Sequence, residues 1–199
     1  MPPNTIMKII LASSSPRRAE ILRDAGIPFT ICSAAIDETP LPNEAAPAMV
    51  ARLAEAKART VTALLQPADH DCIVIGADTT VELNGEILGK PDDAAHAREM
   101  LLKLSGQTHR VVTGIFLLRL PKNIARSAVE ISSVTFASLS DDEISAYILS
   151  REPMGKAGGY AIQGIAGRFI PKIEGCYFNV VGLPLAKVYT LLNELGWRE

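Results

Sequence analysis

The order of apolar and polar positions along the chain predicts alternating strands and helices. Apolar runs of strand length occupy residues 8–12, 29–33 and 72–77, and the last run continues in extended form over 79–83. Two further strands are predicted at residues 110–119 and 125–136. Apolar residues recur at helical spacing in five other segments, which are residues 16–25, 47–65, 93–104, 140–149 and 184–195.

Residues at the element boundaries support these assignments. Asn84-Gly85 predicts a hairpin that returns the chain through residues 86–88, and a second hairpin is predicted with its turn at Glu174-Gly175. Ser140 and Glu143 form a capping box at the start of a helix. Crossover and hairpin connections together predict an α/β fold whose sheet is mixed and flanked by helices. Residues 1–199 are interpreted as one domain, without repeats or a low-complexity linker.

Composition narrows the range of functions. Lys and Arg number 20 against 22 for Asp and Glu, a net charge of −2, which argues against a general nucleic-acid binder. Cys32, Cys72 and Cys176 are far apart, so neither a disulfide framework nor a zinc site is indicated. The apolar run at residues 9–12 is too short for a signal peptide, and no run approaches the length of a membrane span. A cytoplasmic protein is therefore expected.

The segment from Leu11 to Arg18 joins a predicted strand to a predicted helix and forms the first candidate site. Ser13 opens a run of three serines, and Pro16 occupies the first helical position. A helix start offers unpaired backbone N–H groups and a positive dipole end, which together bind phosphate. Arg17 and Arg18 are unfavourable there, because their charges oppose the dipole. A bound anion would offset that cost; the alternative is a solvated basic helix start.

One lysine interrupts the apolar face of the helix predicted at residues 47–65. Lys57 falls in the middle of an inward stripe that consists of Val50, Leu53, Val61 and Leu64. A lysine in this position usually packs its stem against the core and keeps its ammonium group in water. The functional alternative is a charge that points into a cleft toward a phosphate.

Three more charged residues are candidates on positional grounds. Asp78 ends an apolar strand, where ligands usually bind in α/β proteins, and could hold Mg²⁺ or deprotonate an attacking water. A strand end that faces solvent is the alternative. Glu38 could be a second metal-binding carboxylate, although acidic loop residues are usually plain surface residues. Lys90 follows the first predicted hairpin and is expected to reach back toward a phosphate.

A glycine-rich stretch at residues 155–164 combines four glycines with Lys156 and Gln163. Glycines let a backbone approach a ligand closely. The Gln163 amide offers both a donor and an acceptor to a base edge. A flexible loop is the alternative interpretation.

Several common signatures are absent from the sequence. It contains no GxxxxGK[ST], GxGxxG or HExxH motif, which argues against P-loop proteins and kinases. His70, His96 and His109 are isolated in the sequence, so no Ser-His-Asp triad is indicated, and they are expected to be surface or structural residues.

Taken together, these segments resemble the Maf family of nucleoside triphosphate pyrophosphatases. The resemblance covers nearly the whole chain and rests on blocks in family order, namely LASSSPRR, ARLAEAKA, GADTTVELNGEILGKP, LSGQTHRVVTG, and KAGGYAIQG with GCYFNVVGLPL. It implies a mixed, strongly curved sheet and two lobes around a central cleft, similar to enzymes that destroy non-standard triphosphates such as inosine triphosphate.

The resemblance also implies a reaction, a cofactor and roles for residues. The reaction is hydrolysis of a nucleoside triphosphate to the monophosphate and pyrophosphate, with Mg²⁺ or Mn²⁺ as the cation. Asp78 is the implied general base and metal partner, and Glu38 is the implied second acid. The implied phosphate-binding residues are Ser13, Arg17, Arg18, Lys57, Lys90 and Lys156.

The GADTTV block resembles the branch of the family that acts on dTTP and UTP, rather than the branch linked to 7-methyl-GTP. Arg17, Thr79 and Gln163 are then the implied specificity residues. Ser14 stands where many members have glycine, so a slightly different phosphate turn is expected. The implied partner is a nucleotide, with no nucleic acid or membrane, and a homodimer is compatible with the fold. The alternatives are a 7-methyl-GTP pyrophosphatase and a non-enzymatic regulator of septum formation.

Overall fold

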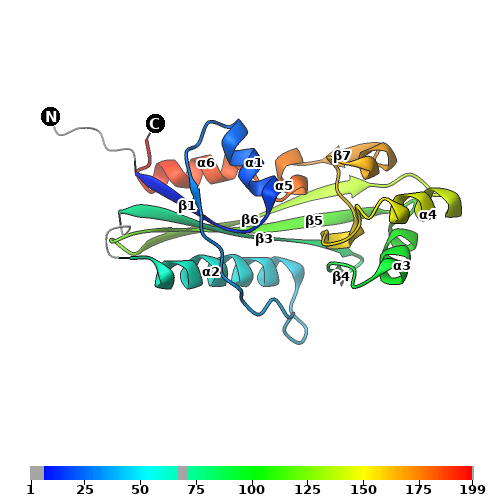
Figure 1. The fold of residues 1–199 in the computed structure, drawn as a ribbon, viewed down its shortest axis with the longest axis horizontal. Helices are drawn as coiled ribbons and strands as arrows, with labels where there is room; N and C mark the ends of the chain where they lie inside the picture. The colour runs from blue at the N-terminus through cyan, green and yellow to red at the C-terminus, as the bar shows by residue number, and fades with distance from the viewer. Residues whose placement is uncertain (1–6, 67–70, 199) are drawn as a thin grey trace.

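Three long strands form the centre of the fold: β3 (Cys72–Leu83), β5 (Thr108–Arg119) and β6 (Ile124–Thr135). The structure is a computed structural model that describes residues 7–66 and 71–198, and it pairs these strands in antiparallel order (Figure 1). β1 (Lys8–Ala12) is parallel to β3 and also to β2 (Thr30–Ile31).

Two short strands complete the sheet. β4 (Glu86–Leu88) pairs with β3, and β7 (Lys172–Glu174) pairs with β6, both in antiparallel orientation. The seven strands follow the order β2-β1-β3-β5-β6-β7, with β4 attached to β3 outside this path. The prediction of a mixed sheet is confirmed.

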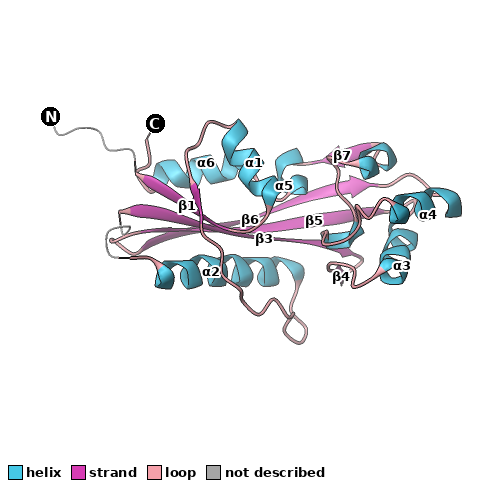
Figure 2. Cartoon of the chain, viewed as in Figure 1, coloured by secondary structure: helices cyan, strands magenta, loops and turns pink. Residues whose placement is uncertain are grey.

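Helices cover both faces of this sheet (Figure 2). One face carries α2 (Ala46–Leu64); the opposite face carries three helices, which are α1 (Pro16–Asp24), α5 (Tyr177–Val181) and α6 (Leu185–Glu194). At the far end of the sheet, α3 (Ala94–Leu104) and α4 (Asp141–Leu149) pack near β4, together with the 3₁₀ turns Ala157–Gly159 and Ile165–Phe169. No helix in the described part of the chain has the length and apolar character of a membrane span.

Two of the buried clusters lie at opposite ends of β3, and two more pack α2 against the sheet. One cluster of buried side chains joins β1, α1 and α6 to the first half of β3. Another joins β4, α3 and α4 to the second half of β3 and the start of β5. This division agrees with the expected two lobes, and it leaves the middle of β3 between them.

Two glycines bring α2 unusually close to the sheet. A Cβ atom at Gly76 would collide with the carbonyl oxygen of Ala54, and one at Gly114 would collide with that of Val50. Both glycines lie in the middle of strands, where glycine normally weakens a sheet but permits a close backbone approach. The close packing brings the side chains of α2 within reach of the polar residues of β3.

This packing predicts a strong effect of a single methyl group. We expect Gly76→Ala to destabilise the fold by about 1–3 kcal/mol, because α2 must move to admit the methyl group. For a chain of this size, each kcal/mol lowers the melting temperature by roughly 2–4 °C. Gly89→Ala is the matched control, since nothing lies within 4 Å of the added Cβ there. Thermal unfolding of both variants would contradict the close packing if Gly76→Ala melted no lower than the control.

Two structural predictions for the first half of the chain were wrong. The strand expected at residues 29–33 shrinks to Thr30–Ile31, whose side chains are both exposed. Leu64 was predicted to face inward with the other apolar residues of this helix, but its side chain is 58% exposed. The reason is that α2 ends there: Leu65 adopts an extended conformation and packs its side chain on the core instead.

The second hairpin was also predicted wrongly. β7 ends at Glu174, but after Gly175 the chain enters the short helix α5 instead of a returning strand. Helical placement lets the fully buried Asn179 donate hydrogen bonds to Val111 O (3.0 Å) and Ser132 Oγ (2.9 Å). A buried amide without these partners would be costly, so these long-range contacts favour the helix.

Candidate active site

The candidate site lies at a gap in the strand pairing along one edge of β3. β1 pairs with β3 only as far as Gly76, and β4 pairs with it only from Val81 onward. Within the described sheet, residues 77–80 therefore have a partner strand on one side only, which is β5. The prediction that Asp78 ends its strand is wrong: β3 continues to Leu83, and the strand that ends beside Asp78 is β1.

A cavity of about 370 Å³ occupies this gap. Its lining comes from the β1–α1 turn, the loop before α2, α2 itself, β3, β5, Lys90 after β4, the segment at residues 154–163, and the end of α5 with Gly182. Ten polar or charged lining residues are those predicted from the sequence: Ser13, Arg17, Arg18, Glu38, Lys57, Asp78, Thr79, Lys90, Lys156 and Gln163. Five of them are cationic and two are carboxylates, so the lining favours a polyanion.

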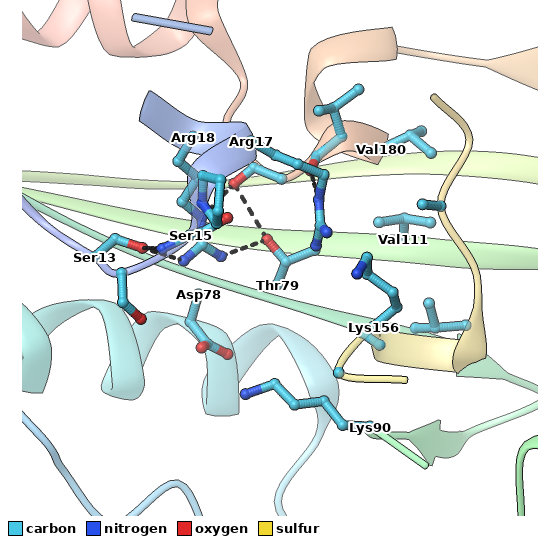
Figure 3. Close-up of a pocket in the computed structure, with 18 of the residues that line it drawn as sticks. Ser13, Ser15, Arg17, Arg18, Asp78, Thr79, Lys90, Val111, Lys156 and Val180 are labelled. Atoms are coloured by element: carbon cyan, nitrogen blue, oxygen red, sulfur yellow. Dashed lines mark hydrogen bonds between the residues drawn. The ribbon is translucent and has the colours of Figure 1, made fainter. Parts of the chain in front are cut away.

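Arg18 is a buried cation held from three sides (Figure 3). Its guanidinium group donates to Gly182 O (2.8 Å), Ser13 Oγ (3.0 Å) and Thr79 Oγ1 (3.0 Å). Burial lowers the pKa of Arg18, and the nearby Asp78 carboxylate opposes this effect. The hydrogen bonds fix the Arg18 side chain in one orientation beside the cavity.

The start of α1 is open to an anion. The Ser15 side chain makes no capping hydrogen bond, and the first turn contains no acidic residue. Arg17 is half-buried, donates to Val181 O (3.4 Å), and lies across the cavity from Lys156 (Figure 3). Ser14 does not have a positive φ, so serine adopts this turn without strain.

Lys57 lies between two carboxylates. Its Nζ atom is 2.6 Å from Asp78 Oδ1 and 2.6 Å from Glu38 Oε1, and its side chain is only 13% exposed. The ammonium group therefore points inward, and the alternative of a lysine that extends into water does not hold. Burial raises the pKa of Glu38, but ion pairing with Lys57 and Lys90 outweighs it and holds that pKa below its usual value.

An ion pair that the sequence did not indicate fixes the loop that carries Glu38. Arg52 on α2 donates twice to the Glu44 carboxylate, at 2.6 Å each, and once to Thr39 O (3.3 Å). Hydrogen bonding to Arg52 lowers the pKa of Glu44 to about 2. The pair ties the loop to α2 next to Glu38, and no sequence motif marks this contact.

The donor set fits a divalent cation only together with a ligand. In residues 7–66 and 71–198, no three His, Cys, Asp or Glu side chains gather into a group that would hold a metal ion alone. Asp78 and Glu38 both contact Lys57 Nζ, so the two carboxylates lie close enough together to contact the same cation. Two carboxylates completed by phosphate oxygens are an ordinary set of ligands for Mg²⁺.

Neither His96 nor His109 lines the cavity. His109 is buried, its Nε2 atom lies 2.7 Å from Tyr160 OH, and burial lowers its pKa to about 4. It packs edge-on against Phe136, so its role is structural, as predicted. His96 pairs with Asp92 near the surface, while His70 lies outside the described residues.

Comparison with known proteins gives consistent matches along the chain. The sequence profile of the family described as Maf-like protein matches residues 8–195. A Pelotomaculum thermopropionicum protein named dTTP/UTP pyrophosphatase is 48% identical over 96% of this chain and 97% of its own length. An Alkaliphilus oremlandii protein of the same name is 50% identical over 94% of this chain and 95% of its own length. Among solved structures, the Staphylococcus aureus Ham1 protein is similar with a TM-score of 0.46 and 18% identity, over 65% of this chain and 72% of that chain.

Proposed function

Because the chain belongs to the Maf family, we propose that it is an enzyme that hydrolyses dTTP and UTP to the monophosphate and pyrophosphate. The names of its relatives, which match nearly the whole chain at 48% and 50% identity, support this substrate class. The observation that carries the proposal is the Asp78 carboxylate within a cavity that five cationic side chains line.

The cations account for binding of the triphosphate chain. A triphosphate brings three to four negative charges, which Arg17, Lys90 and Lys156 can approach from different sides of the cavity. The unpaired N–H groups at the start of α1 add donors that need no reorganisation on binding. Phosphoryl transfer depends mainly on such positioning and on charge stabilisation.

Asp78 is proposed as the general base. Lys57 holds its Oδ1 atom, and none of the described residues donates a hydrogen bond to its Oδ2 atom. A carboxylate fixed in this way can orient a water molecule and accept its proton. A Mg²⁺ or Mn²⁺ ion held by Asp78, Glu38 and phosphate oxygens would neutralise part of the triphosphate charge.

The three specificity residues occupy different positions around the cavity. Thr79 lines the cavity, and its Oγ1 atom already interacts with Arg18, Thr113 (2.9 Å) and Gly182 O (3.3 Å). Gln163 is exposed at the rim, where its amide is available to a base edge. In this proposal Gln163 contacts the base directly, and Thr79 holds Arg18 and the Gly182 carbonyl group in place.

A panel of triphosphates tests this assignment. We expect kcat/KM to be highest for dTTP and UTP, and lower for GTP, ATP and 7-methyl-GTP. Gln163→Ala should reduce the preference by about tenfold while pyrophosphate remains the product, because one hydrogen bond to the base is lost. A rate for 7-methyl-GTP equal to that for dTTP would contradict the proposed substrate class.

A further inference from the structure

Both arginines of the cavity are held by the C-terminal end of α5. Arg17 Nε donates to Val181 O (3.4 Å), and Arg18 Nε donates to Gly182 O (2.8 Å). The carbonyl groups at a helix C-terminus lack intrahelical partners and carry partial negative charge, which suits a guanidinium donor. The orientation of the two arginines therefore depends on where α5 lies.

Buried hydrogen bonds clamp α5 to the sheet. Asn179 Nδ2 donates to Val111 O on β5 and to Ser132 Oγ on β6. Ser132 Oγ in turn accepts from Cys176 N (3.0 Å) and donates to Cys176 O (3.1 Å), just before α5 begins. Asn179 is fully buried and Ser132 is 1% exposed, so water cannot easily replace these bonds.

A second set of contacts runs from α5 to Arg18 through two threonine hydroxyls. Thr113 Oγ1 lies 3.3 Å from Asn179 O and 2.9 Å from Thr79 Oγ1. Thr79 Oγ1 accepts from Arg18 Nη2 at 3.0 Å. Thr113 is fully buried and does not line the cavity, so a nucleotide cannot touch it.

We propose that Thr113 and Asn179 are positioning residues that set the triphosphate affinity of the cavity through Arg17 and Arg18. Asn179 fixes the carbonyl groups that accept from both arginines, and Thr113 fixes the hydroxyl that accepts from Arg18. Loss of either contact frees a guanidinium group, which must then be ordered again when the substrate binds. This inference rests on the proposed function for its kinetic test, but the contacts themselves belong to the free protein.

Replacement of Thr113 gives the clearest kinetic test. We expect Thr113→Val to raise KM for dTTP about tenfold or more with a much smaller change in kcat, because displaced arginines weaken binding of the triphosphate in ground and transition states alike. Thr113→Ser keeps the hydroxyl and should restore KM to within about threefold of wild type. A merely structural role would instead reduce the fraction of active enzyme, and thus lower kcat at unchanged KM.

Thr80→Val is the matched control for this series. Thr80 is a buried strand threonine on β3 whose hydroxyl has no hydrogen-bond partner among the described residues. Its removal should leave KM unchanged. An unchanged KM in Thr113→Val, or an equal rise in Thr113→Ser or Thr80→Val, would overturn the proposal. Asn179→Ala is the companion variant and should raise KM in the same way if it folds.

The Arg18 Nε–H group gives a readout that needs no substrate. In ¹⁵N-arginine-labelled wild-type protein, we expect a slowly exchanging Nε–H signal that disappears in Arg18→Lys. Thr113→Val should shift this signal and accelerate its exchange, whereas Thr113→Ser and Thr80→Val should preserve it. A protein that hydrolyses no triphosphate but shows these shifts would refute the proposed function alone; a signal unaffected by Thr113→Val would refute the positioning role alone.

Discussion

Asp78→Asn is expected to lower kcat for dTTP by about 10²–10⁴-fold, the range typical of a lost general base. Asparagine has nearly the same shape and keeps an oxygen that Lys57 can approach, as it approaches Asp78 Oδ1 at 2.6 Å in the structure. It cannot accept a proton from water at neutral pH. The KM for dTTP should change little, because the cations that bind the triphosphate remain in place.

Steady-state kinetics with a matched acid-to-amide control check this prediction. Asp142→Asn removes a carboxylate from the exposed first turn of α4, outside the cavity lining, and should leave kcat within about twofold. Isothermal titration with dTTP would show whether the Asp78 variant still binds substrate. A kcat for Asp78→Asn equal to that of the control would remove Asp78 from the role of base.

Lys57→Met is expected to lower kcat/KM for dTTP by about 10²-fold or more. Methionine retains the apolar stem of the side chain on α2 but leaves Asp78 and Glu38 without the ammonium group that lies 2.6 Å from both. Their negative charges then repel each other and the incoming triphosphate. Removal of one partner from a closely paired, desolvated set of charges typically costs 2–5 kcal/mol, which corresponds to this range of effects.

Lys103→Met is the matched control for Lys57. Lys103 pairs with Glu86 at 2.6 Å, but both side chains are about half exposed and neither lines the cavity. An exposed ion pair contributes little, so the control should show near-normal kinetics. If Lys57→Met and Lys103→Met had the same kcat/KM, the inward position of Lys57 would have no functional importance.

Local sequence signals were sufficient for much of the fold. The capping box at Ser140 is present in the structure, with Glu143 bonded back to it, and the Asn84-Gly85 hairpin joins β3 to β4 as predicted. The spacing of apolar residues on α2 places Lys57 on the inward face of the helix, and in the structure its ammonium group lies inside the cavity. These features depend on residues close together in the chain, so their spacing carries the information.

Contacts between distant segments could not be predicted in this way. The gap beside Asp78 exists because β1 ends at Ala12, more than sixty residues earlier in the chain. No residue close to Asp78 in the sequence indicates where β1 ends. The Glu174-Gly175 signal fits a hairpin as well as the turn into α5, and the choice depends on the buried Asn179 contacts to β5 and β6.

The most direct test of the proposed reaction is identification of the products from dTTP. Purified protein would be incubated with dTTP and Mg²⁺ or Mn²⁺, and phosphorus NMR would follow the products over time. Cleavage between the α- and β-phosphates should give dTMP and pyrophosphate in equal amounts, with no accumulation of dTDP. Formation of dTDP and orthophosphate would show cleavage at the wrong bond, and the absence of turnover with dTTP and UTP would contradict the proposed enzyme.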